Sequence, residues 1–352
     1  MKIAITADLH LTDKDRNPER FETFERLLAD LRAAKVGTLI IAGDLFDASR
    51  QNYADFERLC RRQENQEIKI YVIPGNHDPT ISSRSITADN LEIIDTPSLL
   101  DFDTLQFLFI PYLPGKTMGE EIARFSDRLP AQEWVLIGHG DWAGGMRTHN
   151  PAEPGVYMPL TRKDIEIYKP ARVFLGHIHA PMDEAPVHYV GSPCGLDINE
   201  TGRRRCLLYD TGTDLVDTHV LDTPVLYFNE SFVIVPVEDE DAYLRAQISS
   251  RMEKWDLNSE ERAKTQLRVK VSGFSADKAA LRALLQEEFD GFSFYKEQEP
   301  DIDEVSVSED REREYIAEQV RAKVVELAWP GGADEPSPDE ILLKALHIIY
   351  KR

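Results

Sequence analysis

The first half of the chain alternates short β-branched runs with helical patterns. The runs that predict strands occupy residues 2–6, 38–42, 69–73, 106–111, 134–137 and 172–175. Between the first two runs, apolar residues recur at steps of three and four, which places them on one face of a helix. These residues are Phe21, Phe24, Leu27, Leu28 and Leu31. The alternation predicts an α/β fold in which such helices cover a sheet.

The spacing of the strand-like runs changes after residue 172. Helical patterns become rare, and strand-like runs follow closely at residues 188–190, 206–209 and 218–221. Closely spaced strands are typical of antiparallel or mixed sheets, because such strands need only short connections. We therefore expect a second sheet here, and a two-sheet sandwich flanked by helices over residues 1–225.

The pattern starts again near Thr223 and Pro224. Two strand-and-helix repeats follow, so we expect a small α/β cap domain over residues 226–297. Residues 298–308 are acidic and contain no aromatic residue, which favours a solvated linker. An edge strand through Val305 and Val307 is the alternative.

Residues 309–352 predict a pair of C-terminal helices. The last helix begins with SPDE at residues 337–340, a capping box with proline in its first turn. Its apolar residues share one face and are Ile341, Leu342, Ala345, Ile348 and Ile349. A stripe of this kind either docks on a partner or packs on the protein's own cap.

Charge and cysteine content limit the function and the location. Forty-one Lys and Arg against 63 Asp and Glu give a formal charge of −22, which repels nucleic acid unless bound cations or a partner offset it. The three cysteines lie far apart with no CxxC pair, as is typical of a reducing compartment. The N-terminus enters a strand pattern directly, and no apolar stretch reaches membrane-spanning length. We therefore expect a cytoplasmic protein with no membrane association.

Five short polar clusters follow strand-like runs. They are DLH at 8–10, GDLFD at 43–47, GNHD at 75–78, GHGD at 138–141 and GHIH at 176–179. Four of them begin with glycine, which lets the backbone turn sharply and approach a ligand without a Cβ. A single strand-end histidine is more often structural than functional. Five clusters in order are better explained by one shared crevice, because the carboxyl ends of strands meet there in open α/β sheets.

The clusters contain a set of seven candidate metal ligands. They are Asp8, His10, Asp44, Asn76, His139, His177 and His179. Carboxylate, amide and imidazole together suit Mn²⁺, Fe²⁺ or Zn²⁺. Seven ligands are too many for one tetrahedral ion but enough for two ions that share a bridging carboxylate. The count favours a binuclear centre, whereas His149, His188, His219 and His347 lie outside the clusters and are expected to be structural.

These motifs resemble those of the calcineurin-like metallophosphoesterases and, within them, the SbcD-type DNA double-strand-break-repair nucleases. The resemblance covers most of residues 1–220 and implies a nuclease domain. It also implies that Asp8, His10 and His179 hold one divalent ion, that Asn76, His139 and His177 hold the other, and that Asp44 bridges them. Mn²⁺ is the metal we expect, with Fe²⁺, Zn²⁺ or Mg²⁺ as alternatives, and metal-activated water is the expected nucleophile.

The same resemblance implies a catalytic pair. His77 would face the scissile phosphate and protonate the leaving oxygen, while Asp47 would orient the imidazole and raise its pKa. A solvated turn acid is the alternative for Asp47 and for Asp78, which follows His77 without an assigned role.

The segments GDLFDASR and GSPCGLDINETGRRRC resemble the repair-nuclease branch and imply a DNA substrate, cut as both exonuclease and endonuclease. Arg203, Arg204 and Arg205 could contact phosphate, or form a solvated hairpin end. The resemblance further implies that the cap orients DNA, that the C-terminal helices dock on an SbcC-type SMC-like coiled-coil ATPase, and that the protein forms a homodimer.

Two other functions stay open. A phosphatase or a cyclic-nucleotide phosphodiesterase with regulatory C-terminal modules would use the same ligand set. A scaffolding subunit with a subordinate metal site is the alternative outside the enzymes.

Overall fold

The computed structural model describes residues 1–48, 52–130, 133–144, 155–235, 237, 239–307, 311–327 and 336–350. The chain divides into two compact units, which are described separately below. The first comprises Met1–Leu196 with Arg203–Pro224, and the second comprises Asp197–Gly202 with Val225–Arg352.

The first sheet of unit 1 has six strands in the order β12-β11-β1-β2-β3-β4. Their bounds are β1 Lys2–Thr6, β2 Thr38–Ala42, β3 Lys69–Ile73, β4 Leu91–Ile93, β11 Arg205–Asp210 and β12 Leu215–Val220. Strands β1 to β4 are parallel, and β11 pairs antiparallel with β1. The expected strands at 2–6, 38–42 and 69–73 are confirmed.

The second sheet has the order β5-β6-β7-β8-β10-β9. Its strands are β5 Ser98–Phe102, β6 Leu105–Ile110, β7 Trp134–His139, β8 Arg172–Gly176, β9 Met182–Glu184 and β10 Val187–Tyr189. Its parallel centre, β6-β7-β8-β10, therefore begins well before residue 172. The prediction that the strands after residue 172 make up the second sheet is wrong for β11 and β12, which extend the first sheet. Alternation of apolar residues identifies a strand but not the sheet that accepts it.

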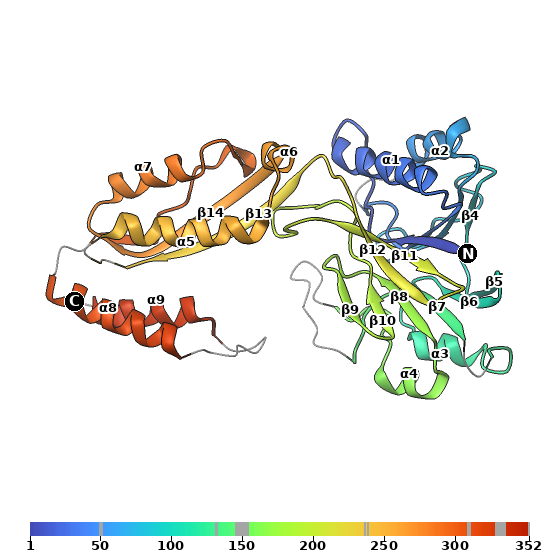
Figure 1. Ribbon diagram of the computed structural model, residues 1–352. Coiled ribbons are helices and arrows are strands. Elements are labelled where there is room, and N and C mark those ends of the chain that lie inside the picture. Colours follow the sequence, from blue (N-terminus) through green and yellow to red (C-terminus); the bar gives the residue numbers. More distant parts are fainter. Residues whose placement is uncertain are drawn as a thin grey trace. The chain divides into compact units, whose positions relative to one another are not determined.

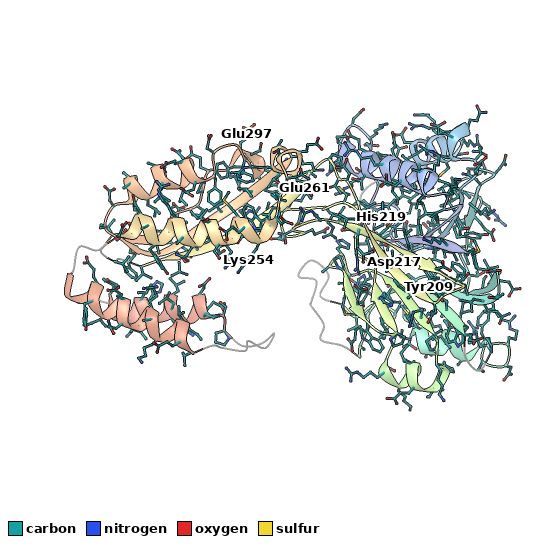
Figure 2. The ribbon with its side chains drawn as sticks, viewed as in Figure 1. Tyr209, Asp217, His219, Lys254, Glu261 and Glu297 are labelled. Atoms are coloured by element: carbon teal, nitrogen blue, oxygen red, sulfur yellow. The ribbon has the colours of Figure 1, made fainter. Side chains whose placement is uncertain are left out.

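Unit 1 has four layers, with a helix layer outside each sheet (Figure 1). Helices α1, Pro18–Ala33, and α2, Tyr53–Cys60, cover the first sheet, and α3, Met118–Ala123, and α4, Arg162–Tyr168, cover the second. All five apolar residues expected on one face of α1 are buried. Aromatic side chains such as Phe109, Phe174 and Tyr209 fill the space between the sheets. Tyr209 is labelled in Figure 2. The predicted two-sheet sandwich flanked by helices is confirmed.

Unit 2 is built on a second, smaller α/β core. Its sheet contains β13 Leu226–Ile234, β14 Thr265–Ser275, β15 Ser293–Phe294 and β16 Val305–Val307. Its helices are α5 Glu240–Trp255, α6 Ser259–Ala263 and α7 Lys278–Glu288, with Lys254 and Glu261 labelled on α5 and α6 in Figure 2. Alternate residues of β13 and β14 pack against α5 and α7, and the apolar ones are Leu226, Phe228, Phe232, Ile234, Leu267, Val269 and Val271.

The segment expected to be a solvated linker, residues 298–308, is partly folded onto this sheet. Val305–Val307 forms β16, which pairs parallel with β14. Ile302 and Val305 are only 4% and 2% exposed, because both reach the core between the sheet and its helices. The linker prediction is therefore wrong for these residues, and the alternative edge strand is the one observed.

Two helices close the chain, α8 Arg311–Glu326 and α9 Pro338–Ile349. Ser337 and Glu340 form the expected reciprocal capping box at the start of α9. Leu342 and Leu346 pack with Val233 and Phe274 of the small sheet, so part of the apolar stripe is covered by the protein itself. Across the described residues, no helix is both long and apolar enough to span a membrane.

Candidate metal centre

The five polar clusters meet at one edge of unit 1. Asp8 and His10 follow β1, Asp44 follows β2, and Asn76 follows β3. From the second sheet, His139 ends β7, and His177 and His179 follow β8. Backbone hydrogen bonds from Asp8 N to Gly43 O and from His10 N to Asp44 O, each 3.0 Å, join the first two loops. All seven predicted ligands are brought together, as the position of the clusters at strand ends indicated.

One group of ligand atoms is formed by Asp8, His10 and His179, which all lie within 4.8 Å of one another. His10 Nε2 lies 3.1 Å from His179 Nε2 and 3.6 Å from Asp44 Oδ2. Two imidazole nitrogens this close, with carboxylates on either side, match the donor set of a divalent transition metal.

A second group centres on Asn76. Its Oδ1 lies 2.8 Å from His139 Nε2 and 3.0 Å from His177 Nδ1. His139 Nε2 is also 3.3 Å from Asp44 Oδ2. Asp44 therefore adjoins both groups, which is the position that a bridging carboxylate requires.

The backbone around these ligands is held in an unusual conformation. Asp8, His10, Asp44 and His177 have φ values of 54°, 46°, 50° and 95°. Left-handed backbone at a residue with a side chain costs about 1–3 kcal/mol and is concentrated at functional sites. Four of the seven candidate ligands carry this strain, so the fold holds them in place at a cost in stability.

Glycine at two loop positions allows the ligand loops to touch. A Cβ at Gly43, where φ is 94°, would overlap the His139 imidazole, and a Cβ at Gly75 would overlap the Asp44 carboxylate. The expectation that glycine permits close approach is therefore confirmed at these two positions.

The electrostatics of the site favour a cation. Burial raises the pKa of Asp8 from 3.8 to about 6, and burial lowers the pKa of His10 from 6.5 to about 3. Burial alone would lower the pKa of His139, but the charge of Asp44 raises it to about 9. Asp8 Oδ2 is buried and has no hydrogen-bond partner in the described part of the chain. A buried carboxylate oxygen of this kind needs a cation or a proton.

Surrounding groups orient several ligands. His139 donates from Nδ1 to the carbonyl of Ala42 at 2.9 Å, which turns Nε2 toward Asn76. Asp8 Oδ1 accepts a 2.8 Å hydrogen bond from the backbone N–H of His177. Hydrogen bonds of this kind select the imidazole tautomer and fix ligand orientation in metal sites. The residues present therefore fit a pair of divalent ions.

The predicted catalytic pair lies beside the first group. The backbone N–H of His77 donates to Asp44 Oδ1 at 2.8 Å, and its ring stands edge-on to His10 with centroids 4.6 Å apart. Asp47 Oδ2 lies 4.0 Å from Nδ1 of His10 and 3.8 Å from Nη1 of Arg20. The direct pairing of Asp47 with His77 stays a prediction.

A family model described as calcineurin-like phosphoesterase matches residues 1–181, which is just over half of the 352 residues. The chain belongs to the calcineurin-like phosphoesterases. Members of this family use divalent metal ions, and the Asp and His groups described above are suited to hold them.

The curated proteins that match this phosphoesterase include two archaeal proteins and one phage protein. "DNA double-strand break repair protein Mre11" of Methanopyrus kandleri is 26% identical over 242 residues, which cover 58% of this chain and 51% of the relative. The protein of the same name from Haloferax volcanii is 25% identical over 304 residues, covering 82% and 65%. "Exonuclease subunit 1" of Enterobacteria phage T4 is 26% identical over 198 residues, covering 51% and 54%. The chain thus spans about half to two thirds of the length of these relatives.

Two buried acids of the phosphoesterase site were not recognised from the sequence. Asp78, left open as a solvated turn acid, is fully buried and accepts hydrogen bonds from Gly75 N at 2.7 Å and Phe46 N at 2.9 Å. Asp141 accepts from Tyr157 N at 2.6 Å, and its other oxygen lies 3.8 Å from His177 Nε2. Each acid comes two residues after a predicted ligand, Asp78 after Asn76 in GNHD and Asp141 after His139 in GHGD, which is the only signal the sequence offered.

The prediction that the three consecutive arginines contact DNA is wrong for Arg204. Arg204 is 3% exposed, and its guanidinium hydrogen-bonds Ser192 and the carbonyl of His179. Arg205 is half-buried and makes a two-pronged ion pair with Asp183 at 2.6 and 3.0 Å. Arg203 is exposed, and its contact with DNA stays a prediction.

Three of the histidines outside the clusters have structural partners, as expected. His188 Nδ1 lies 2.8 Å from Asp183, and His347 Nδ1 lies 2.8 Å from the carbonyl of Leu343. His219, labelled on β12 in Figure 2, is 2.9 Å from Asp30 of α1. His149 lies outside the described residues.

Proposed function

We propose that this phosphoesterase is a two-metal DNA nuclease, with exonuclease and endonuclease activity, that works as the nuclease subunit of a double-strand-break-repair complex. The observation that carries the proposal is the convergence of two ligand groups on Asp44 from the strand ends of both sheets. Similarity to the two Mre11 proteins and to the phage exonuclease subunit supports DNA as the substrate.

The ligand groups divide between two ions. Asp8, His10 and His179 would hold one, Asn76, His139 and His177 would hold the other, and Asp44 would contact both. We propose Mn²⁺, with Fe²⁺, Zn²⁺ or Mg²⁺ as alternatives, because imidazole and carboxylate are mixed in each group. Bound ions supply the positive charge that activates water and stabilises the oxygens of the attacked phosphodiester.

His77 is the proposed general acid. His77 lies beside His10 and Asp44 and is half-buried, so its imidazole would be able to face a bound phosphodiester. It would donate a proton to the oxygen that leaves, a role worth typically about 10²–10⁴-fold in rate. Asp47 would orient the imidazole and keep it protonated.

DNA binding by an acidic chain needs help from elsewhere. A formal charge of −22 opposes the approach of a polyanion, so we propose that the partner subunit supplies most of the phosphate contacts. Within this chain, the exposed Arg203 and the cap over residues 226–297 would orient the duplex. A homodimer would present two such sites to one DNA.

We propose that the C-terminal helices dock on an SbcC-type SMC-like coiled-coil ATPase. A groove of about 550 Å³ runs along α9, and its lining includes Ile341, Leu343 and Ile348. Ile348 is 74% exposed although the rest of its stripe is partly covered. An Ile348→Asp variant should keep its stability within about 0.5 kcal/mol and lose co-purification with the ATPase, because exposed apolar anchors matter for binding and little for folding. Undiminished co-purification would contradict this docking surface.

The nuclease is tested with His77→Ala, using His219→Ala in the same unit as the control. Linear duplex DNA, single-stranded DNA and a cyclic nucleotide are incubated with each protein and Mn²⁺, and the bound metal is counted. His77→Ala should bind metal as the wild type does and cut DNA about 10²–10⁴-fold more slowly, while His219→Ala stays active. Full activity of His77→Ala would refute the acid role, and a preference for the cyclic nucleotide would favour the phosphodiesterase alternative. Metal-free protein that still supports its complex would favour the scaffold.

A further inference from the structure

Two arginines with little solvent exposure contact the backbone of His10 and His179, two residues of the group that also contains Asp8. Arg20 comes from the first turn of α1, and its side chain is 10% exposed. Arg204 lies just before β11 and is 3% exposed. Fully charged guanidinium groups are rarely buried without a specific partner, so the contacts of each arginine indicate its role.

Arg204 fastens the loop that carries His179. Its Nη2 donates to the carbonyl of His179 at 2.5 Å and to Ser192 Oγ at 2.6 Å, and its Nε donates to the carbonyl of Ser192 at 2.9 Å. The backbone N–H of Ser192 donates to the same His179 carbonyl at 3.2 Å. The planar guanidinium group of Arg204 therefore links the His179 loop to the segment after β10 by hydrogen bonds.

Arg20 makes the matching contact on the other histidine. Its Nη1 donates to the carbonyl of His10 at 2.5 Å and lies 3.8 Å from Asp47 Oδ2. His10 has a φ of 46°, so its backbone needs contacts that hold it in the left-handed region. The two imidazoles whose backbones are held this way are the pair with Nε2 atoms 3.1 Å apart.

A positive charge beside a cation site opposes the cation, so neither arginine can favour metal binding through its charge. Their main-chain hydrogen bonds instead favour it through geometry, because they reduce the freedom that the two imidazoles would lose on coordination. We infer that Arg20 and Arg204 are positioning residues that preorganise His10 and His179 for one of the two ions. This inference rests on the proposed metal centre and goes beyond it, since it distinguishes the two ion sites.

The test is a titration of the full chain with Mn²⁺ in the absence of DNA. Calorimetry measures the two binding steps, and electron paramagnetic resonance detects the coupled pair of ions. In Arg204→Met and in Arg20→Met, one of the two binding steps should weaken about 10–100-fold, the usual effect of losing a group that orients a ligand. The other step, at Asn76, His139 and His177, should stay within about threefold, and the coupled spectrum should appear only at higher Mn²⁺. Arg204→Lys keeps a charge and a donor and should recover part of the loss.

Arg172→Met is the matched control. Arg172 is a partly buried arginine that also donates to main-chain carbonyls, those of Ala171 and Asp214, at the far end of β8 from His177. Its loss should leave both binding steps unchanged. The inference is overturned if both steps keep wild-type affinity in the Arg20 and Arg204 variants, or if both weaken together. Should Arg204→Met fail to fold, Arg20→Met and Arg204→Lys decide by the same criteria. A wild-type chain that binds no pair of Mn²⁺ ions would refute the proposed function itself.

Discussion

Asp78 offers the most direct test of how the fold supports the candidate metal centre. Its carboxylate joins two loops, since it accepts from Phe46 N, two residues after Asp44, and from Gly75 N, directly before Asn76. Both N–H groups are buried, and a buried donor left without an acceptor costs about 1–3 kcal/mol. Asp78→Ala leaves two such donors, so it should cost about 2–6 kcal/mol. Asp78→Asn keeps one acceptor and should cost about 1–3 kcal/mol.

The consequence for the site is loss of metal affinity beyond the loss of stability. Displacement of the two loops moves Asp44 and Asn76 relative to each other, so both Asp78 variants should bind Mn²⁺ more weakly by about 10-fold or more. Urea unfolding measures the stability, and calorimetric titration with Mn²⁺ measures the affinity.

Asn90→Ala is the control for this experiment. Asn90 is buried and donates to the carbonyls of Asn65 and Ile68, so it joins two backbone segments at the amino end of β3 as Asp78 does at the carboxyl end. Asn90→Ala should lose a comparable amount of stability and retain Mn²⁺ affinity. If Asp78→Asn loses stability but binds Mn²⁺ like the wild type, the reasoning that the carboxylate holds the ligand loops is refuted.

Three further predictions concern packing and pH. Gly75→Ala should cost about 1–3 kcal/mol and weaken Mn²⁺ binding in calorimetry, because its Cβ would overlap Asp44; unchanged binding would contradict this. Burial and the nearby charge of Asp44 raise the pKa of Asp78 from 3.8 to about 7. In metal-free protein, the stability contributed by protonated Asp78 is therefore complete below pH 3.8 and is lost as the pH rises through about 7. Urea midpoints of metal-free protein should therefore fall less steeply between those values in Asp78→Asn than in the wild type, and equal slopes would argue against the raised pKa. Leu346→Ala should destabilise unit 2 by about 2–5 kcal/mol in urea unfolding and leave Mn²⁺ binding intact, because Leu346 is fully buried there.

The ligands could be predicted from the sequence because their position follows from the geometry of parallel strands. Asp8 and Asp44 come two residues after the ends of buried strands that pair in parallel, and His139 ends such a strand in the other sheet. Strand ends of this kind converge whatever their separation along the chain. The position of the site therefore needed no knowledge of side-chain contacts.

The supporting residues could not be predicted, because their partners are distant and their surroundings are invisible in one sequence. In the sequence Asp78 resembles an acid in a solvated turn, because only the fold places its hydrogen-bond donors Phe46 N and Gly75 N beside it. Arg203 and Arg204 were expected to act together, but neighbours in an extended segment point to opposite faces, so one is exposed and the other buried. This alternation alone predicts that consecutive arginines do not share one exposed surface.

The ligands come from both sheets, with Asp44 and Asn76 carried by one and His139 and His177 by the other. Apolar packing between two layers has no preferred direction, whereas metal coordination fixes the positions of particular ligand atoms. Ions bound between the two sheets would cross-link them at one edge. Sliding of one sheet over the other would then have to break coordination bonds. The resistance of the two-sheet sandwich to deformation would therefore depend on bound metal. Removal of the ions by a chelator would increase mobility first at the edge that carries the ligand loops.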